Sequence, residues 1–155
     1  MPATLQTELP LSAVRVRRPL TDRAGARERL DVDDWQLDRW LDAGKIRGVL
    51  DIASRGAEKQ ELRFLSVAIE EFKRELVIER TDEEFARAIF GLPQPLLRAQ
   101  RIYSRLNCHP THFYDLAREK VLRLAKGSEQ RTGPGGSAVV EWSELLRFIS
   151  QRRRA

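Results

Sequence analysis

An internal repeat constrains the fold of this 155-residue chain more than any other feature of its sequence. When the chain is compared with itself at a shift of 76 positions, apolar residues come into register, for example Leu20 with Leu96 and Leu37 with Phe113. From residue 65 onward we place the register at 77, with one residue inserted at a hairpin tip. Two diverged copies of one small domain would therefore account for most of the chain.

Each copy has the same expected order of elements. A helix is followed by a break of three or four residues and a second helix, which we expect to be capped by Asp33 in one copy and to begin at Pro110 in the other. A β-hairpin then precedes a helix capped by Ser66 or Ser143. A helix-turn-helix with a hairpin is a winged helix-turn-helix. The sequence thus predicts an α+β, mostly helical fold with two tandem winged helix-turn-helix units and small β-hairpin wings.

The repeat also sets the expected domain boundaries. Residues 1–18 form a basic N-terminal arm, 19–76 the first copy, 77–94 a helical connector and 95–155 the second copy. In the connector, Thr81 and Glu84 have capping-box spacing, and an apolar stripe follows. We expect this stripe, made of Phe85, Ala88 and Ile89, to pack on one of the copies or on another subunit, and Gly91 to end the helix.

The segment 30-LDVDDWQLDRWLDAGKI-46 resembles the recognition-helix region of MerR-like and excisionase-like winged helix-turn-helix domains. The resemblance covers residues 18–76 and 94–152 and implies a DNA-binding fold in which the wing is followed by a serine-started helix. The second copy departs from the pattern, because Lys120 stands where the first copy has Gly44. This difference puts the turn from helix to wing in the second copy in doubt.

The two second helices would present different surfaces. In the first copy, Leu37, Trp40 and Leu41 share the face that we expect to be buried. The outward face then carries carboxylates and an exposed tryptophan, which DNA phosphates would repel. We expect this face to bind a protein or another subunit, and its candidate residues are Trp35, Asp38, Arg39 and Asp42. Plain solvent exposure is the alternative.

In the second copy, the helix over residues 110–118 would bury Phe113, Leu116 and Ala117. Its outward face is polar and basic, which suits base edges and phosphates. The base-edge candidates are Thr111, His112 and Tyr114, and the phosphate-contact candidates are Arg118, Lys120, Arg123, Lys126 and Arg131. We expect this helix to enter the major groove of double-stranded DNA, with a wing over about 123–140 on flanking DNA. Solvent exposure is again the alternative.

The only cysteine and both histidines lie close together as Cys108, His109 and His112. Structural zinc needs about four nitrogen or sulfur ligands, which this cluster cannot supply. Cys108 also matches the apolar Val32 of the first copy, which favours a small buried side chain. No phosphate-binding glycine motif or catalytic triad is recognisable. We therefore predict no metal, no cofactor and no enzymatic activity.

The charge distribution favours a polyanionic partner. Residues 1–30 carry a net charge of +3, residues 31–90 of −5 and residues 91–155 of +7. The basic segments 14-VRVRRPL-20 and 152-RRR-154 could each be an arm along DNA or a solvated tail. We expect a cytoplasmic, nucleoid-associated regulator, either a transcription factor or an excisionase-type architectural factor. The alternative is an adaptor or subunit of a nucleoprotein complex. No run of about 18 apolar residues could span a membrane.

Overall fold

A computed structural model describes residues 18–129 and 137–154 of the chain. The described part is α+β, with seven helices that make up roughly half of it and two small antiparallel sheets. In chain order, the elements are β1 (Leu20–Thr21), α2 (Arg23–Leu30), α3 (Asp34–Asp42), β2 (Val49–Asp51), β3 (Leu62–Leu65), α4 (Ser66–Lys73), α5 (Asp82–Phe90), β4 (Leu96–Arg98), α6 (Ala99–Arg105), α7 (Pro110–Arg118), β5 (Val139–Glu141) and α8 (Trp142–Arg152). The predicted α+β class is confirmed.

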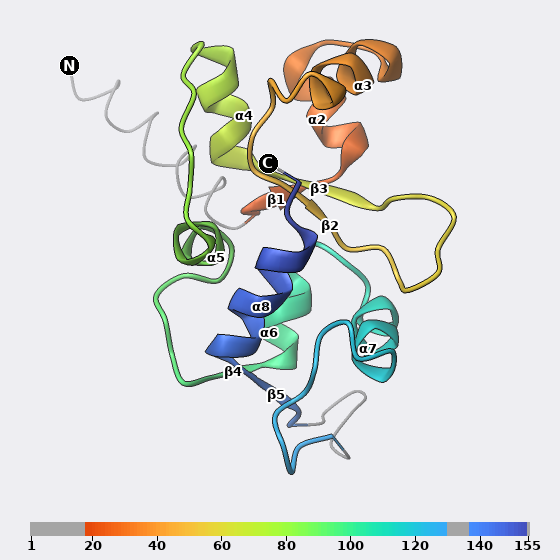
Figure 1. Cartoon of the computed structure of the whole chain (residues 1–155), viewed down its shortest axis with the longest axis vertical. Helices are drawn as coiled ribbons and strands as arrows, with labels where there is room; N and C mark the ends of the chain where they lie inside the picture. The colour runs from red at the N-terminus through yellow and green to blue at the C-terminus, as the bar shows by residue number, and fades with distance from the viewer. Residues whose placement is uncertain (1–17, 130–136, 155) are drawn as a thin grey trace, which may run out of the picture.

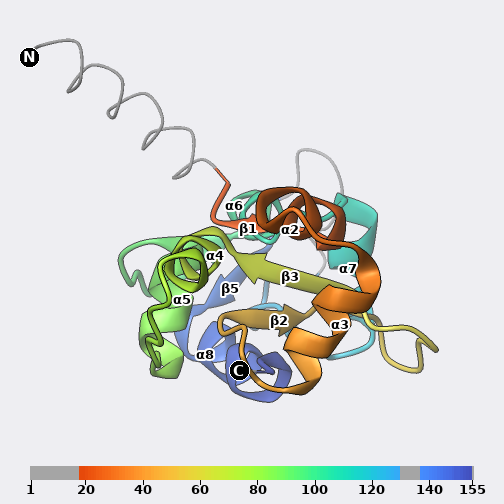
Figure 2. The same cartoon turned by 90° about the horizontal axis from the view of Figure 1, so that it is seen from above.

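We call β1 to α4 the first unit and β4 to α8 the second unit, with α5 between them. The three strands of the first unit form an antiparallel sheet in the order β1-β3-β2, with Leu20 opposite Leu65. The second unit contains the pair β4-β5, with Leu97 opposite Val140. Figure 1 shows the helices of the first unit above the three-stranded sheet and those of the second unit below it. Seen from above, α4 and α5 lie at one side and α3 and α7 at the other (Figure 2).

The repeat is visible in the backbone hydrogen bonds. The N–H of Ser66 donates to the carbonyl of Pro19 at 2.8 Å, and the N–H of Trp142 donates to that of Pro95 at 3.2 Å. Both partners are shifted by 76 positions, and so are the starts of α4 and α8. The predicted change to a shift of 77 is therefore wrong. The similarity of side chains suggested the shift of 77 because α4 and α8 contain consecutive apolar residues that both pack on the core, so that a displacement by one residue still aligns apolar positions.

The turn between the first two helices has the same conformation in each unit. Asp31 and Asn107, the equivalent residues, both have φ of 56°. At the end of the second helix, Gly44 has φ of 69° and Lys120 has φ of 63°. The substitution of lysine for glycine therefore leaves this turn intact, although a side chain in the left-handed region is strained.

The helix starts agree with the prediction in part. The side chain of Asp33 accepts from the N–H of Gln36 at 2.9 Å, which confirms it as an N-cap, and Pro110 is the first residue of α7. The prediction that Ser66 and Ser143 cap their helices is wrong. The Ser66 hydroxyl lies inside α4 and donates to the carbonyl of Arg18 at 2.8 Å, while α8 begins at Trp142, one residue before the expected serine. In both helices the preceding strand runs directly into the helix, so a side-chain cap is absent at these two positions.

The connector helix α5 lies in the main core. Its capping box between Thr81 and Glu84 is present, and it ends at Gly91 as predicted. Its buried residues are Phe85, Ala86, Ile89 and Phe90, and Ala88 is partly buried. They join one apolar cluster with Leu20 and Leu50 of the first unit and Ile102 and Phe148 of the second. The connector stripe thus packs within the chain and on both units, chiefly against α8.

The C-terminal arginines also join the two units. The N–H of Arg154 donates to the carbonyl of Val49 at 2.8 Å, and Arg153 forms an antiparallel bridge with Leu50. The Arg152 guanidinium donates to the carbonyl of Ala53 at 2.9 Å. The expected tail or DNA arm at 152–154 is therefore wrong, because these residues extend the edge of the first sheet. The other expected arm, residues 14–20, is described only from residue 18, and its last residue, Leu20, is buried in β1; residues 14–17 and most of the segment 1–18 lie outside the described residues.

Candidate nucleic-acid interface

Helix α7 presents one apolar and one polar face. Phe113, Leu116 and Ala117 are buried, as predicted. Thr111 is exposed at the start of the helix, and the side chain of Arg118 is 72% exposed at its end, where it pairs with Asp115. Two of the eight candidate side chains therefore lie on the open surface of the helix itself.

The other two helical candidates have intramolecular contacts. The Nε2 atom of His112 contacts the carbonyl oxygen of Ile52 and lies 3.3 Å from a carboxylate oxygen of Glu61. Tyr114 is half-buried and packs edge-on against Phe113, with 5.1 Å between the ring centroids. In this conformation His112 contacts the first unit, a role that the sequence did not indicate.

The basic candidates of the segment after α7 are exposed, and two of them lie near the same carboxylate. Lys120, Arg123 and Lys126 are exposed. Backbone N–H groups lower the pKa of the Glu129 carboxyl, and the charges of Lys120 and Lys126 lower it further, which places both amines near one carboxylate. Arg131, the remaining candidate, lies outside the described residues. Lys120 and Lys126 thus lie near one carboxylate in the segment that follows Arg118, while Arg123 lies beside Glu144 of α8.

The loop of the first unit, residues 52–61, lies beside α7 (Figure 1). The N–H of Arg55 donates to a carboxylate oxygen of Glu119 at 2.9 Å, immediately after the helix. The side chains of Arg55 and Lys59 are exposed on this loop. Sequence reasoning missed this arrangement, because contacts between residues about sixty positions apart leave no periodic pattern.

Helix α3 of the first unit is the counterpart of α7, and its outward face is acidic but partly neutralised. Asp38 and Asp34 on α3 both form ion pairs with Arg23 of α2, and the Arg23–Asp34 distance is 2.9 Å. Trp35 is 64% exposed, and the Arg39 guanidinium stacks 4.8 Å from its ring centroid. Asp42 is exposed at the end of the helix. The structure thus places the four predicted protein-interaction residues on one exposed helix.

Cys108 is a half-buried thiol in the turn before α7. Burial raises its pKa to about 11, while the charge of Arg63 lowers it and that of Glu61 raises it. Within residues 18–129 and 137–154, no three His, Cys, Asp or Glu side chains are grouped as metal ligands.

No helix in the described part of the chain has the length and apolar character needed to cross a membrane. Comparison with protein-family models, curated proteins and solved structures finds no match for this chain.

Proposed function

We propose that this protein is a DNA-binding regulator, a transcription factor or an excisionase-type architectural factor, and that its two units are tandem winged helix-turn-helix domains. The observation that carries the proposal is the contrast between two equivalent helices. The exposed end of α7 leads into Lys120, Arg123 and Lys126, whereas α3 carries the carboxylates of Asp34 and Asp38. Since phosphates dominate DNA affinity, α7 is the better suited of the two equivalent helices.

In this proposal, α7 enters the major groove with its N-terminal end toward the bases. Thr111 at the first turn is an exposed base-edge candidate. Arg118 and the cations of the segment 120–126 contact the phosphates. His112 would remain on the first unit, or would have to leave Ile52 and Glu61 before it could reach a base.

The loop of residues 52–61 would add a second flank. Its contact with Glu119 places Arg55 next to the basic end of α7, and Lys59 is exposed on the same loop. Both side chains can contribute phosphate contacts to a duplex that lies along α7. The first unit would then support DNA binding through its loop, while its own second helix stays off the DNA.

The test measures binding of the full chain to fluorescent random duplexes by anisotropy. Arg118→Glu with Lys126→Glu should weaken binding at least about tenfold, because two cations that meet phosphate become anions. The matched control is Arg39→Glu with Lys45→Glu, which makes the same change in net charge on exposed residues of the first unit. Equal weakening by the two double variants would reject α7 as the DNA-binding helix.

A second candidate function is supported by Trp35. A tryptophan that is 64% exposed and stacked with Arg39 is typical of a protein-binding surface. We infer that α3 could bind a protein partner or a second copy of this chain, as an adaptor in a nucleoprotein complex would. Trp35→Ala should then leave duplex binding unchanged and abolish the association of the chain with itself or with its partner. Analytical ultracentrifugation measures the association of the chain with itself.

A further inference from the structure

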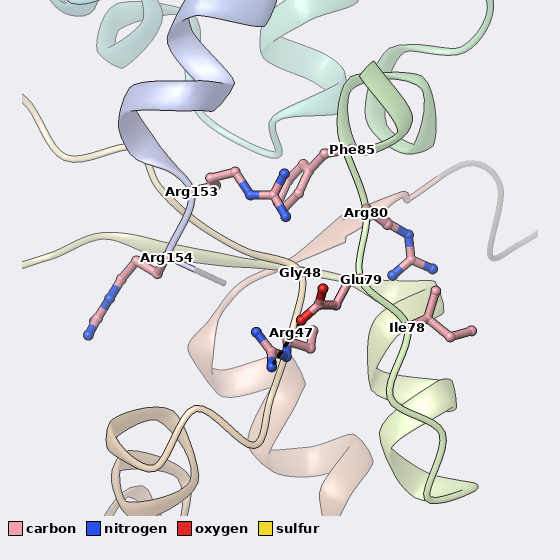
Figure 3. A pocket seen from close by; sticks show the side chains of 8 residues that line it. All are labelled: Arg47, Gly48, Ile78, Glu79, Arg80, Phe85, Arg153 and Arg154. Carbon is pink, nitrogen blue, oxygen red and sulfur yellow. Dashed lines mark ion pairs between the residues drawn. The ribbon is translucent and has the colours of Figure 1, made fainter. Parts of the chain in front are cut away.

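A cavity of about 320 Å³ lies where the two units and the connector meet (Figure 3). Its wall comes from three parts of the chain: the turn Arg47–Gly48 before β2, the connector with residues 78–80 and Phe85, and the C-terminal pair Arg153–Arg154. This volume is at the lower end of the range found for small-molecule sites. The position is therefore suited to a small ligand that contacts both units at once.

Four arginines and one glutamate line the cavity, but the arginines differ in their partners. Arg80 is held by both carboxylate oxygens of Glu71, and Arg154 donates to the side chain of Gln60 at 2.8 Å. Figure 3 shows both side chains directed away from Phe85. These two guanidinium groups have protein acceptors outside the cavity.

Arg47 and Arg153 are less completely bound. The Nε atom of Arg47 is buried and has no hydrogen-bond partner, and its other end reaches only Glu79, at 3.6 Å. Arg153 donates to Asp82 at 3.0 Å through one nitrogen, and its guanidinium lies over the Phe85 ring at 5.0 Å from the centroid. The terminal nitrogens of Arg47 thus have one long contact, and Arg153 keeps guanidinium nitrogens that do not bind Asp82. An anionic ligand in the cavity would accept from these nitrogens.

We propose that this cavity binds a small phosphate monoester, with its phosphate held by Arg47 and Arg153. Guanidinium groups bind phosphate through paired N–H donors, and a dianion with three terminal oxygens can serve two of them. The Phe85 ring beneath the Arg153 guanidinium is the apolar part of the cavity wall, and the Ile78 side chain is directed away from it (Figure 3). Glu79 opposes the anion, but its side chain is 79% exposed and its one contact is long, so it can turn into solvent.

The ligand would connect the turn before β2 with the end of α8, and binding should therefore stabilise the arrangement of the two units. The proposal is independent of DNA binding, because none of the cavity residues belongs to α7 or to the segment 120–126.

The experiment titrates the full chain with glycerol 3-phosphate at constant ionic strength and follows the arginine Nε–H signals by NMR. We expect saturable shifts of the Arg47 and Arg153 signals and at least about tenfold weaker binding in Arg47→Gln. The matched control, Arg98→Gln, replaces an exposed arginine outside the cavity and should bind as the parent does. Glycerol with sodium chloride should cause no shift.

A second variant keeps the test valid if Arg47→Gln folds poorly. Glu79→Gln removes the opposing carboxylate from an exposed position and should tighten glycerol 3-phosphate binding several-fold. Linear, non-saturating shifts that persist in Arg47→Gln would overturn the proposal. So would a loss of duplex binding in Arg47→Gln without any change in glycerol 3-phosphate binding, because the arginine would then belong to the DNA surface.

Discussion

Two glycines in the connection between α3 and β2 permit a controlled test of the first unit. Gly44 and Gly48 both have a left-handed backbone, with φ of 69° and 73°. A Cβ at Gly44 would meet no atom within 4 Å, whereas one at Gly48 would lie 2.7 Å from the Cβ of Ala68 and 3.1 Å from side-chain atoms of Leu65. Alanine would therefore be under the same kind of backbone strain at both positions, but it would clash with neighbouring side chains only at position 48.

The strain at positive φ costs about 1–2 kcal/mol for a residue with a side chain. The lower entropy of the unfolded alanine chain offsets roughly 0.4–1 kcal/mol of this. We expect Gly44→Ala to lose about 1 kcal/mol of unfolding free energy by this difference. Gly48→Ala should lose a further 1–3 kcal/mol or so, as overpacked cores do, because α4 cannot move away without disturbing β3.

Urea unfolding followed by far-UV circular dichroism measures both losses on the same scale. In thermal unfolding, each kcal/mol corresponds to a shift of roughly 2–4 °C for a domain of this size. Equal losses of about 1 kcal/mol would refute the close approach of Gly48 to α4. Equal losses of roughly 2–4 kcal/mol would instead show that the turn at Gly44 is packed rather than open.

Three further changes have defined outcomes. Lys120→Gly should stabilise the chain by about 1 kcal/mol in urea unfolding, because it removes a lysine from the left-handed region. Burial alone would raise the pKa of Glu144, but the Arg147 guanidinium together with the N–H and the charge of Arg123 outweighs this effect and keeps the pKa below its ordinary value of 4.5. The ion pair therefore stabilises the fold above about pH 4.5 and loses its effect as the pH falls through the lowered pKa, so Glu144→Gln should destabilise the chain at neutral pH and flatten the loss of stability in acid. Because the pKa of Cys108 is about 11, Ellman's reagent should label it slowly at neutral pH and rapidly in urea, and equal rates would contradict its burial.

The sequence was a good guide to local structure and to the apolar faces. The cap at Asp33, the proline at the start of α7 and the buried side of Phe113 all depend on residues within one or two turns of each other. Such features are encoded by spacing alone. The repeat was also recognisable, although its register near α8 could be fixed only by the backbone hydrogen bond from Trp142 to Pro95.

The contacts between the units could not be predicted from the sequence. The contact of His112 with Ile52 and the bridge of Arg153 to Leu50 join residues far apart in the chain. A histidine or arginine on an exposed helix end has the same local pattern whether it binds a neighbouring loop, DNA or water. For the candidate site, the sequence therefore identified the helix and its exposed Thr111 and Arg118, but it did not predict that the loop of residues 52–61 lies beside them.

The salt dependence of duplex binding tests the proposed function most directly. Four described cations, Arg118, Lys120, Arg123 and Lys126, are expected to meet phosphates, and each contact contributes about −0.9 to the slope of log K against log salt. We predict a slope of roughly −3.6 for the parent chain, and a steeper one if Arg55 and Lys59 also meet phosphates, and we expect the slope to become shallower by about 1.8 when Arg118 and Lys126 are replaced by glutamine. A slope near zero, or the same slope in both proteins, would contradict DNA binding through α7 and the segment that follows it.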